Sequence, residues 1–185
     1  KWFATSTIAG TLILVDRLWS CSGIPFGAGT YAITTPGNLP ARITDGGVGC
    51  QAWVEQFVAA GAASGTLTLN YKNPADGAEV GVIPAVVSAP LIGQLQPIPL
   101  AVGATGVRSI VSAVNSATWT SGSWGLTIVK PIAAISITLA GIGNTLDWAT
   151  LGLPDIPNDA CLSFIWQGGA ATANQIMSRM EIIDC

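Results

Sequence analysis

The sequence predicts an all-β fold, an antiparallel β-sandwich of the jelly-roll type with about ten short strands. Three observations lead to this prediction. Twenty-two glycines and eleven prolines interrupt the 185 residues at short intervals, and the segments between them are rich in Val, Ile, Thr and Trp. No segment has the spacing of a convincing amphipathic helix. Short β-branched runs bounded by turn residues are typical of antiparallel sandwiches and barrels.

The predicted strands follow one another along the whole chain, and we expect a single β-sandwich domain over residues 1–185. A chain of this length buries roughly 70% of the surface that its unfolded form exposes, so a core forms without metals or disulfides. The predicted strands are 11–18, 49–58, 66–72, 78–85, 93–100, 106–114, 124–130, 134–140, 161–167 and 175–183.

Two turns predict hairpins. Asn-Pro-Ala-Asp-Gly at 73–77 joins two alternating runs, because proline sets one turn angle and Asp-Gly readily takes a left-handed position. Gly-Ala-Thr-Gly at 103–106 predicts a second hairpin, which places Arg108 near a strand end. Residues 51–63 compete as a helix, but their polar face is weak and we favour a strand there.

Charged residues are scarce. They make up 9% of the chain, against about 25% in an ordinary globular protein. The surface is therefore either rich in uncharged polar residues or covered by other protein, as in permanently assembled subunits. The net charge is −3 and the basic residues are spread singly, which argues against a nucleic-acid binder because such proteins concentrate Lys and Arg. The basic residues are Lys1, Arg17, Arg42, Lys72, Arg108, Lys130 and Arg179.

The mean hydropathy of +0.55 raises the question of a membrane span. The best apolar window, 131–143, is shorter than the roughly 18 residues that a spanning helix needs. Ser136, Thr138 and glycines also interrupt it. We therefore predict no membrane span and no membrane partner.

The four cysteines, Cys21, Cys50, Cys161 and Cys185, lie far apart, and the chain has no histidine. A zinc site would need all four sulfurs or added carboxylates, so we predict no metal and no cofactor. Buried reduced thiols are the favoured state, because a free cysteine behaves as a small apolar residue. A disulfide between Cys21 and Cys50 stays open as an alternative.

The chain lacks the usual residues for nucleophilic catalysis. Without histidine, a Ser-His-Asp or Cys-His arrangement is impossible within the chain, and no phosphate-loop or zinc-protease motif is present. A carboxylate pair would suffice for glycoside hydrolysis. Asp155 and Asp159 are the nearest candidates, but they flank a proline turn that accounts for them. We therefore predict no enzyme and no catalytic residues.

The seven tryptophans have two alternative uses. Tryptophan fills sandwich cores and subunit interfaces, and this use is favoured. Exposed tryptophans would instead hold sugars in a carbohydrate-binding, lectin-like sandwich. Trp119 and Trp124 bracket the polar loop TWTSGSW and are the pair that we expect to be partly exposed.

Five short motifs follow one another over most of the chain. They are VDRLWSCSGI (15–24), YKNPADGAEVGVIPA (71–85), PIPLAVGATGVRSIVSA (97–113), SWGLTIVKPIA (123–133) and LGLPDIPNDACLSFIW (151–166). In this order they resemble a group of tailed-phage virion proteins. The resemblance implies a structural component of a bacteriophage particle with no enzymatic role, located in the virion and assembled in the host cytoplasm. Pro74 and the segment 24–47 depart from the group's pattern.

Within the virion, we predict a capsid cement or decoration protein that binds the outside of the major capsid shell as a homo-oligomer, with a trimer favoured. Such a protein stabilises the shell by mass action, because it binds the assembled lattice better than separate subunits. Its partners would be the major capsid protein or other virion subunits. The alternatives are a tail, neck or head-fibre component, and the lectin-like sandwich outside the virion class.

The candidates for interface residues are Arg17, Arg42, Arg108, Trp119 and Trp124. Arginine makes two-pronged ion pairs in apolar interfaces, and an arginine at the solvent surface is the equal alternative. Neither alternate face of 107–114 is polar, which predicts a strand covered on both sides. Arg108 would then pair, near the rim of this strand, with a carboxylate or backbone carbonyl of the oligomer or of the shell.

Overall fold

The computed structural model describes residues 1–185 with the exception of 34–38, 64, 120, 169–174 and 182–185. The described residues form strands, turns and loops, and every recorded strand pair is antiparallel. This confirms the predicted all-β class. Among the residues described there is no helix with the length and hydropathy to cross a membrane.

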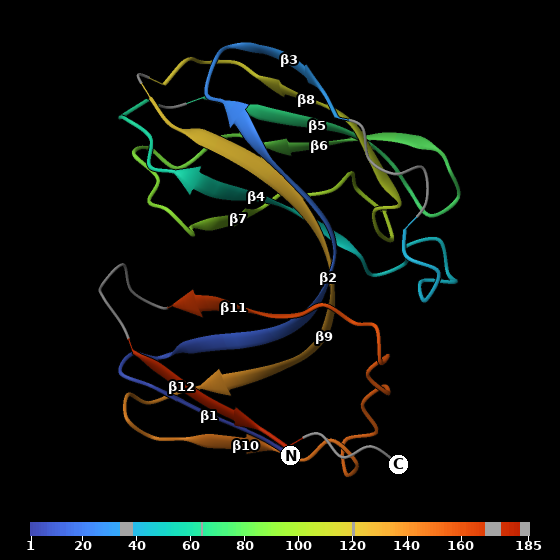
Figure 1. Cartoon of the computed structure of the whole chain (residues 1–185), viewed down its shortest axis with the longest axis vertical. Helices are drawn as coiled ribbons and strands as arrows, with labels where there is room; N and C mark the ends of the chain where they lie inside the picture. The colour runs from blue at the N-terminus through green and yellow to red at the C-terminus, as the bar shows by residue number, and fades with distance from the viewer. Residues whose placement is uncertain (34–38, 64, 120, 169–174, 182–185) are drawn as a thin grey trace. The chain divides into compact units, whose positions relative to one another are not determined.

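The strands, labelled in Figure 1, form three sheets. Their bounds are β1 (Trp2–Ser6), β2 (Gly10–Pro25), β3 (Gly29–Ala32), β4 (Gln51–Val58), β5 (Leu67–Lys72), β6 (Ala78–Ile83), β7 (Leu95–Pro97), β8 (Ser109–Asn115), β9 (Ser123–Ile137), β10 (Asn144–Leu146), β11 (Leu162–Gly168) and β12 (Ile176–Met180). The sheet orders are β10-β1-β12, β11-β2-β9-β4-β7 and β3-β8-β5-β6.

Contacts between residues divide the chain into two compact units. We call Arg17–Lys130 the large unit, and Lys1–Asp16 together with Pro131–Cys185 the small unit. The unit boundaries fall inside β2 and β9, so each of these long strands belongs partly to both units. The expectation of a single domain over residues 1–185 stays a prediction.

The large unit has the strand order of a jelly roll. Over its described residues, the strands from β2 to β9 pair as β2-β9-β4-β7 in one sheet and β3-β8-β5-β6 in the other. In this order, strands that are distant in the chain become neighbours, as two Greek keys require. The predicted jelly-roll type is therefore confirmed in this unit.

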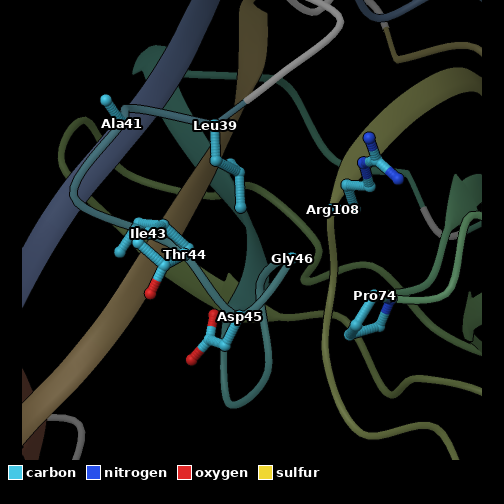
Figure 2. A pocket seen from close by; sticks show the side chains of 8 residues that line it. All are labelled: Leu39, Ala41, Ile43, Thr44, Asp45, Gly46, Pro74 and Arg108. Atoms are coloured by element: carbon cyan, nitrogen blue, oxygen red, sulfur yellow. The ribbon is translucent and has the colours of Figure 1, made fainter.

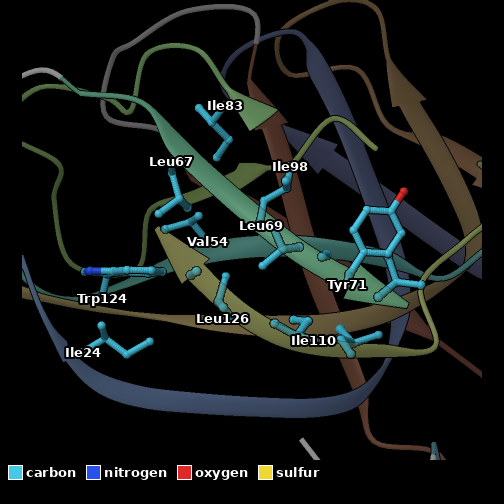
Figure 3. Close-up of a cluster of buried hydrophobic side chains, with 14 of the residues drawn as sticks. Ile24, Val54, Leu67, Leu69, Tyr71, Ile83, Ile98, Ile110, Trp124 and Leu126 are labelled. Atoms are coloured by element: carbon cyan, nitrogen blue, oxygen red, sulfur yellow. The ribbon is translucent and has the colours of Figure 1, made fainter. Parts of the chain in front are cut away.

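An apolar core fills the large unit between these sheets (Figure 3). Leu67, Leu69 and Tyr71 are buried and alternate with half-buried residues along β5, as expected for a strand with one covered face. Trp124 and Leu126 on β9 belong to the same cluster and come from the other sheet. The period-two pattern of the sequence thus decides which side chains of β5 fill the core.

The predicted hairpin at 73–77 is confirmed, because β5 and β6 pair in register on either side of it. The side-chain oxygen of Asn73 accepts hydrogen bonds from the backbone N–H groups of Ala75 and Gly77, at 3.0 and 2.9 Å. Asp76 takes the left-handed position, with φ of 67°. The turn chemistry of the sequence is therefore sufficient to place this hairpin.

The second predicted hairpin, at 103–106, is wrong. β7 before it pairs with β4, and β8 after it pairs with β5 and β3, so this turn connects the two sheets. Gly106 serves another purpose, since a Cβ there would overlap the carbonyl oxygen of Gly47. In the sequence, a glycine that permits the close approach of two backbones looks the same as one that permits a tight turn.

Some strand boundaries also differ from the prediction. The predicted strands 124–130 and 134–140 form one strand, β9, which continues through Pro131. β4 pairs with β9 only as far as Val129, so beyond that residue β9 has lost one neighbour and tolerates a proline. β1, β3 and β10 were not predicted, and each of them has only three to five residues.

The two faces predicted for residues 107–114 are also wrong, because a bulge interrupts β8. On β5, the neighbouring residues Asn70 and Tyr71 pair with Ser112 and Ile110 of β8. Val111 therefore has no paired residue on β5 and forms the bulge. Ile110 is consequently buried, while Val111 is 49% exposed. Cover of the outer face by another protein stays a prediction.

The small unit has an apolar core of its own. Its buried members come from β1, from the first half of β2 and from the second half of β9: Trp2, Ala4, Leu12, Leu14, Ile135 and Ile137. Trp2 Nε1 donates a hydrogen bond to Ser178 Oγ at 2.7 Å, so its polar atom is paired although the ring is buried. β2 and β9 thus supply core residues to both units.

Substituting Gly125 tests the close packing of β9 on β2. A Cβ at Gly125 would overlap the carbonyl oxygen of Cys21, so we expect Gly125→Ala to lower the free energy of unfolding by about 1–3 kcal/mol through overpacking. Urea and thermal unfolding measure this loss. The control is Ala134→Val, which enlarges an exposed side chain on the same strand and should change stability by less than about 0.5 kcal/mol. Equal stability of the two variants would contradict the close contact.

Candidate functional site

A hollow of about 600 Å³ opens on the large unit beside Arg108. Figure 2 shows the loop 39–46 along one side of it, and Pro74 and Arg108 on the other. We call it the Arg108 hollow; its lining residues are Leu39, Ala41, Ile43, Thr44, Asp45, Gly46, Pro74 and Arg108. The fold therefore joins three segments that are distant in the sequence.

Glycines hold the loop in place on its side of the hollow. Gly46 and Gly47 have φ of 70° and 99°, and a Cβ on Gly47 would overlap the carbonyl oxygen of Val107. The Asp45 carboxylate accepts a hydrogen bond from the Gly47 N–H at 3.0 Å. Since glycine alone combines a left-handed backbone with such close contact, the sequence Asp-Gly-Gly positions Asp45 at this site.

Two lysines bind the carboxylates near the hollow, Lys130 from a distant strand and Lys72 from the same hairpin as its partner Asp76. Lys130 Nζ donates to Asp45 Oδ2 at 2.7 Å, and this hydrogen bond is the main cause that lowers the pKa of Asp45. Lys72 Nζ donates to Asp76 Oδ1 at 3.0 Å and likewise lowers the pKa of Asp76. Asp45, Lys72 and Lys130 were not predicted as site residues, because only the fold brings Lys130 to Asp45 and the 72–76 hairpin to the hollow.

Arg108 shares the carboxylate of Asp76 with Lys72. Its Nη1 lies 3.6 Å from Asp76 Oδ1, and its backbone N–H donates to the Lys72 carbonyl at 2.8 Å, directly before β8 begins. Arg108 therefore lies near a strand end, as predicted, and it has a carboxylate partner. This partner, Asp76, belongs to the same chain and not to another subunit. Arg42 is half-buried and lies in the chain between the lining residues Ala41 and Ile43, but it is not part of the lining.

Glu79 supports the hairpin next to the hollow. Its carboxylate accepts hydrogen bonds from Tyr71 Oη at 2.6 Å and from Asn73 Nδ2 at 2.7 Å. Tyr71 Oη also accepts a hydrogen bond from the Ala101 N–H at 3.1 Å. Burial, together with the bond to Glu79, raises the pKa of Tyr71 to about 12. Of the charged residues in this region, Arg108 and Asp45 are the ones that line the hollow.

Arg17 lies outside the hollow and forms an ion pair with Glu55. Its Nη1 donates to Oε1 at 3.4 Å and its Nη2 donates to Oε2, so the contact has two prongs. The side chains of Arg17 and Glu55 are 29% and 16% exposed, which places the pair at a partly covered surface of the large unit. A role of Arg17 and Arg42 in an interface with another protein stays a prediction.

Trp119 and Trp124 are only 3% and 1% exposed, so the expectation that they are partly exposed is wrong. The ring of Phe26 lies 4.8 Å from that of Trp119 and 6.1 Å from that of Trp124, between ring centroids. Trp124 Nε1 also donates to the Pro25 carbonyl at 3.3 Å. The loop between them is polar, but both rings turn inward because they fill one end of the core.

The cysteines form no disulfide among the described residues. Cys21, Cys50 and Cys161 are thiols, and Cys185 lies outside the described residues. The disulfide that the sequence left open between Cys21 and Cys50 is therefore not formed, and burial raises the pKa of the Cys21 thiol. Cys161 is exposed, so the expectation of buried thiols is wrong for this residue. Among the described residues, no group of three His, Cys, Asp or Glu side chains is placed to hold a metal.

Asp155 and Asp159 lie exposed on a loop of the small unit. The Ala160 N–H donates to the Pro157 carbonyl at 2.9 Å and closes a turn over residues 157–160, which contains Asp159. This agrees with turn chemistry as the reason for their presence.

Comparison with protein-family models, with curated proteins and with solved structures gives no match for this chain. The lining of the Arg108 hollow combines the Arg108 guanidinium and the Lys130-bound carboxylate of Asp45 with an apolar wall of Leu39, Ile43 and Pro74. Such a surface suits the binding of a carboxylate-bearing partner, because a guanidinium group pairs with carboxylates in a fixed geometry.

Titration of Tyr71 tests the hydrogen bonds next to the hollow. In a Tyr31→Phe variant, Tyr71 is the one remaining tyrosine, and phenolate absorbance is expected to show a midpoint near pH 12, against about 10 for an unperturbed tyrosine. The fold favours the neutral phenol, so its stabilisation is complete below about pH 10 and is lost as the pH rises toward 12. A midpoint near the ordinary value would contradict the buried hydrogen bonds. In a Tyr71→Phe variant, the loss of stability that ionisation of Tyr71 causes between about pH 10 and 12 should be absent.

Proposed function

We propose that the protein is a structural component of a bacteriophage particle, a capsid cement protein that binds the outside of the major shell and stabilises it. The observation that carries the proposal is an uncharged aliphatic segment on the large unit. No Asp, Glu, Lys or Arg stands between Glu79 and Arg108. The exposed large aliphatic residues of this segment are Val80, Val82, Val87, Leu91, Ile92 and Val102. Exposed apolar surface with few charges is typical of contact with other protein.

One turn of this segment presents two aliphatic side chains in a defined conformation. Leu91 and Ile92 are 71% and 69% exposed. The Gln94 N–H donates to the Leu91 carbonyl at 3.0 Å, the Leu91 N–H donates to the Gln94 side chain at 3.1 Å, and Gly93 takes φ of 80°. An ordered turn loses little further entropy on binding, so it suits insertion into a partner surface.

The fold and the motifs support the proposal in different ways. Jelly rolls occur in viral capsid proteins and also in lectins, so the large unit agrees with both of the function classes considered. The five motifs that resemble tailed-phage virion proteins favour the phage particle. A cement protein would add its binding free energy to the shell by mass action, and this role needs no catalytic group.

The lectin-like alternative lacks its main requirement. All seven tryptophans are described, and none of them is exposed. A platform of exposed tryptophan rings for stacking on sugars is therefore missing. A tail, neck or head-fibre component remains the second candidate within the virion, because it would use the same aliphatic surface.

Purified particles test the proposed function. The protein is expected in them at a copy number comparable with that of the shell subunit, and particles without it should release DNA at a lower temperature and under milder osmotic shock. A copy number that corresponds to a single ring would instead indicate a neck or tail component. Absence from particles, or unchanged stability of particles that lack it, would contradict the cement role.

Leu91→Asp tests the aliphatic turn. We expect binding to isolated shells to weaken by at least about tenfold, because burying one leucine side chain contributes roughly 1.5–3 kcal/mol. The melting temperature should stay the same, since Leu91 is exposed. Ser22→Asp adds the same charge at an exposed position of the large unit outside the aliphatic segment and is the matched control. If both variants bind the shell like the unmodified protein, this turn is not the contact.

A further inference from the structure

The two units differ in charge. The small unit holds two basic residues against six acidic ones, a formal net charge of −4, and the large unit holds five basic and four acidic residues, a formal net charge of +1. The acidic residues of the small unit are Asp16, Asp147, Asp155, Asp159, Glu181 and Asp184. Opposite charges on two parts of one protein favour association in which unlike parts of different copies meet.

The Arg108 hollow offers a guanidinium group beside apolar side chains, and the carboxylate in its lining, Asp45, is bound by Lys130. The Arg108 side chain is 33% exposed, and Leu39, Ile43 and Pro74 form the apolar part of the lining (Figure 2). The volume of about 600 Å³ lies within the range of about 300–1,000 Å³ that is typical of binding pockets. It therefore has room for several side chains of a loop.

The loop 151–160 of the small unit, which we call the Asp155 loop, presents such a carboxylate. Asp155 is exposed between Pro154 and half-buried Ile156, which packs on the core of the small unit. Trp148 Nε1 donates to the Pro154 carbonyl at 2.8 Å. Because this bond and the prolines restrict the loop, little chain would have to be ordered on binding.

We propose that the Arg108 hollow of one copy binds the Asp155 loop of a second copy, with an ion pair between Arg108 and Asp155 at its centre. Charge complementarity between the two units selects a second copy as the partner. The contact joins two different surfaces, so it closes into a ring when the rotation between copies permits. This is the type of contact that the expected trimer requires. The inference rests on the proposed function, since it names how copies of the virion protein join one another.

Charge exchange in the full chain tests the inference. Sedimentation velocity over a range of concentrations should show that the unmodified protein self-associates, and that Arg108→Glu and Asp155→Arg each weaken association by at least about tenfold. The double variant restores the ion pair with its charges reversed and should recover association to within about threefold of the unmodified protein. Added salt should weaken both associating forms, because it screens the pair.

Two controls accompany the exchange. Arg179→Glu reverses a charge at an exposed position of the small unit outside the Asp155 loop and should associate like the unmodified protein. A peptide of residues 151–160 should inhibit association, while the same peptide with Asp155→Asn should not. If Arg108→Glu does not fold, the exposed Asp155→Arg variant and the two peptides decide the outcome.

Three results would overturn the inference: a protein that stays monomeric at every concentration, single variants that associate like the unmodified protein, or a double variant that fails to recover. Shell binding of the same variants separates this failure from failure of the proposed function. Binding to shells without self-association would remove the Arg108–Asp155 contact and leave the cement role. If the protein self-associates through this pair but is absent from particles, the Arg108–Asp155 contact stands and the cement role is contradicted.

Discussion

Both units depend on the pairing of β2 with β9. The two strands are neighbours in one sheet, and each supplies buried side chains to both apolar cores. In the large unit they lie so close that Gly125 has no room for a Cβ beside the Cys21 carbonyl, and Thr127 Oγ1 donates to the Trp19 carbonyl at 3.0 Å. Weakening this pairing would expose buried side chains of both cores. It would lower the stability of both units, since buried apolar area is the main source of stability.

The scarcity of charge is a second constraint, and it shapes the surface. The described ion pairs join Arg17 with Glu55, Lys72 and Arg108 with Asp76, Lys130 with Asp45, and Arg179 with Glu181. Outside them, long segments rely on small polar and aliphatic side chains, some of which are largely exposed. Such a surface is well suited to permanent contact with protein. In the Arg108 hollow, charged and apolar side chains of the large unit lie side by side.

Local chemistry predicted much of the fold and little of the site. The hairpin at 73–77 follows from Asn73 and Asp76, which need only their own backbone neighbours. The inward rings of Trp119 and Trp124 could not be predicted, because a ring next to a polar loop turns inward only if the core behind it has space. The same holds for Lys130 beside Asp45, since the two residues meet only after β9 has paired with β4. Contacts of this kind depend on register, and one bulge, as at Val111, changes the register without any signal in the composition.

The sequence by itself determined the all-β class, the jelly-roll type, most strands and one hairpin, because period-two patterns and turn residues act over a few neighbouring positions. The tertiary structure alone decided that the chain divides into two compact units, that the turn at 103–106 connects two sheets, and that Arg108 and Asp45, which are distant in the sequence, line one hollow. The physical reason is the same in each case. Which strands pair across long stretches of chain is settled by the joint burial of apolar faces, and no local segment carries that information.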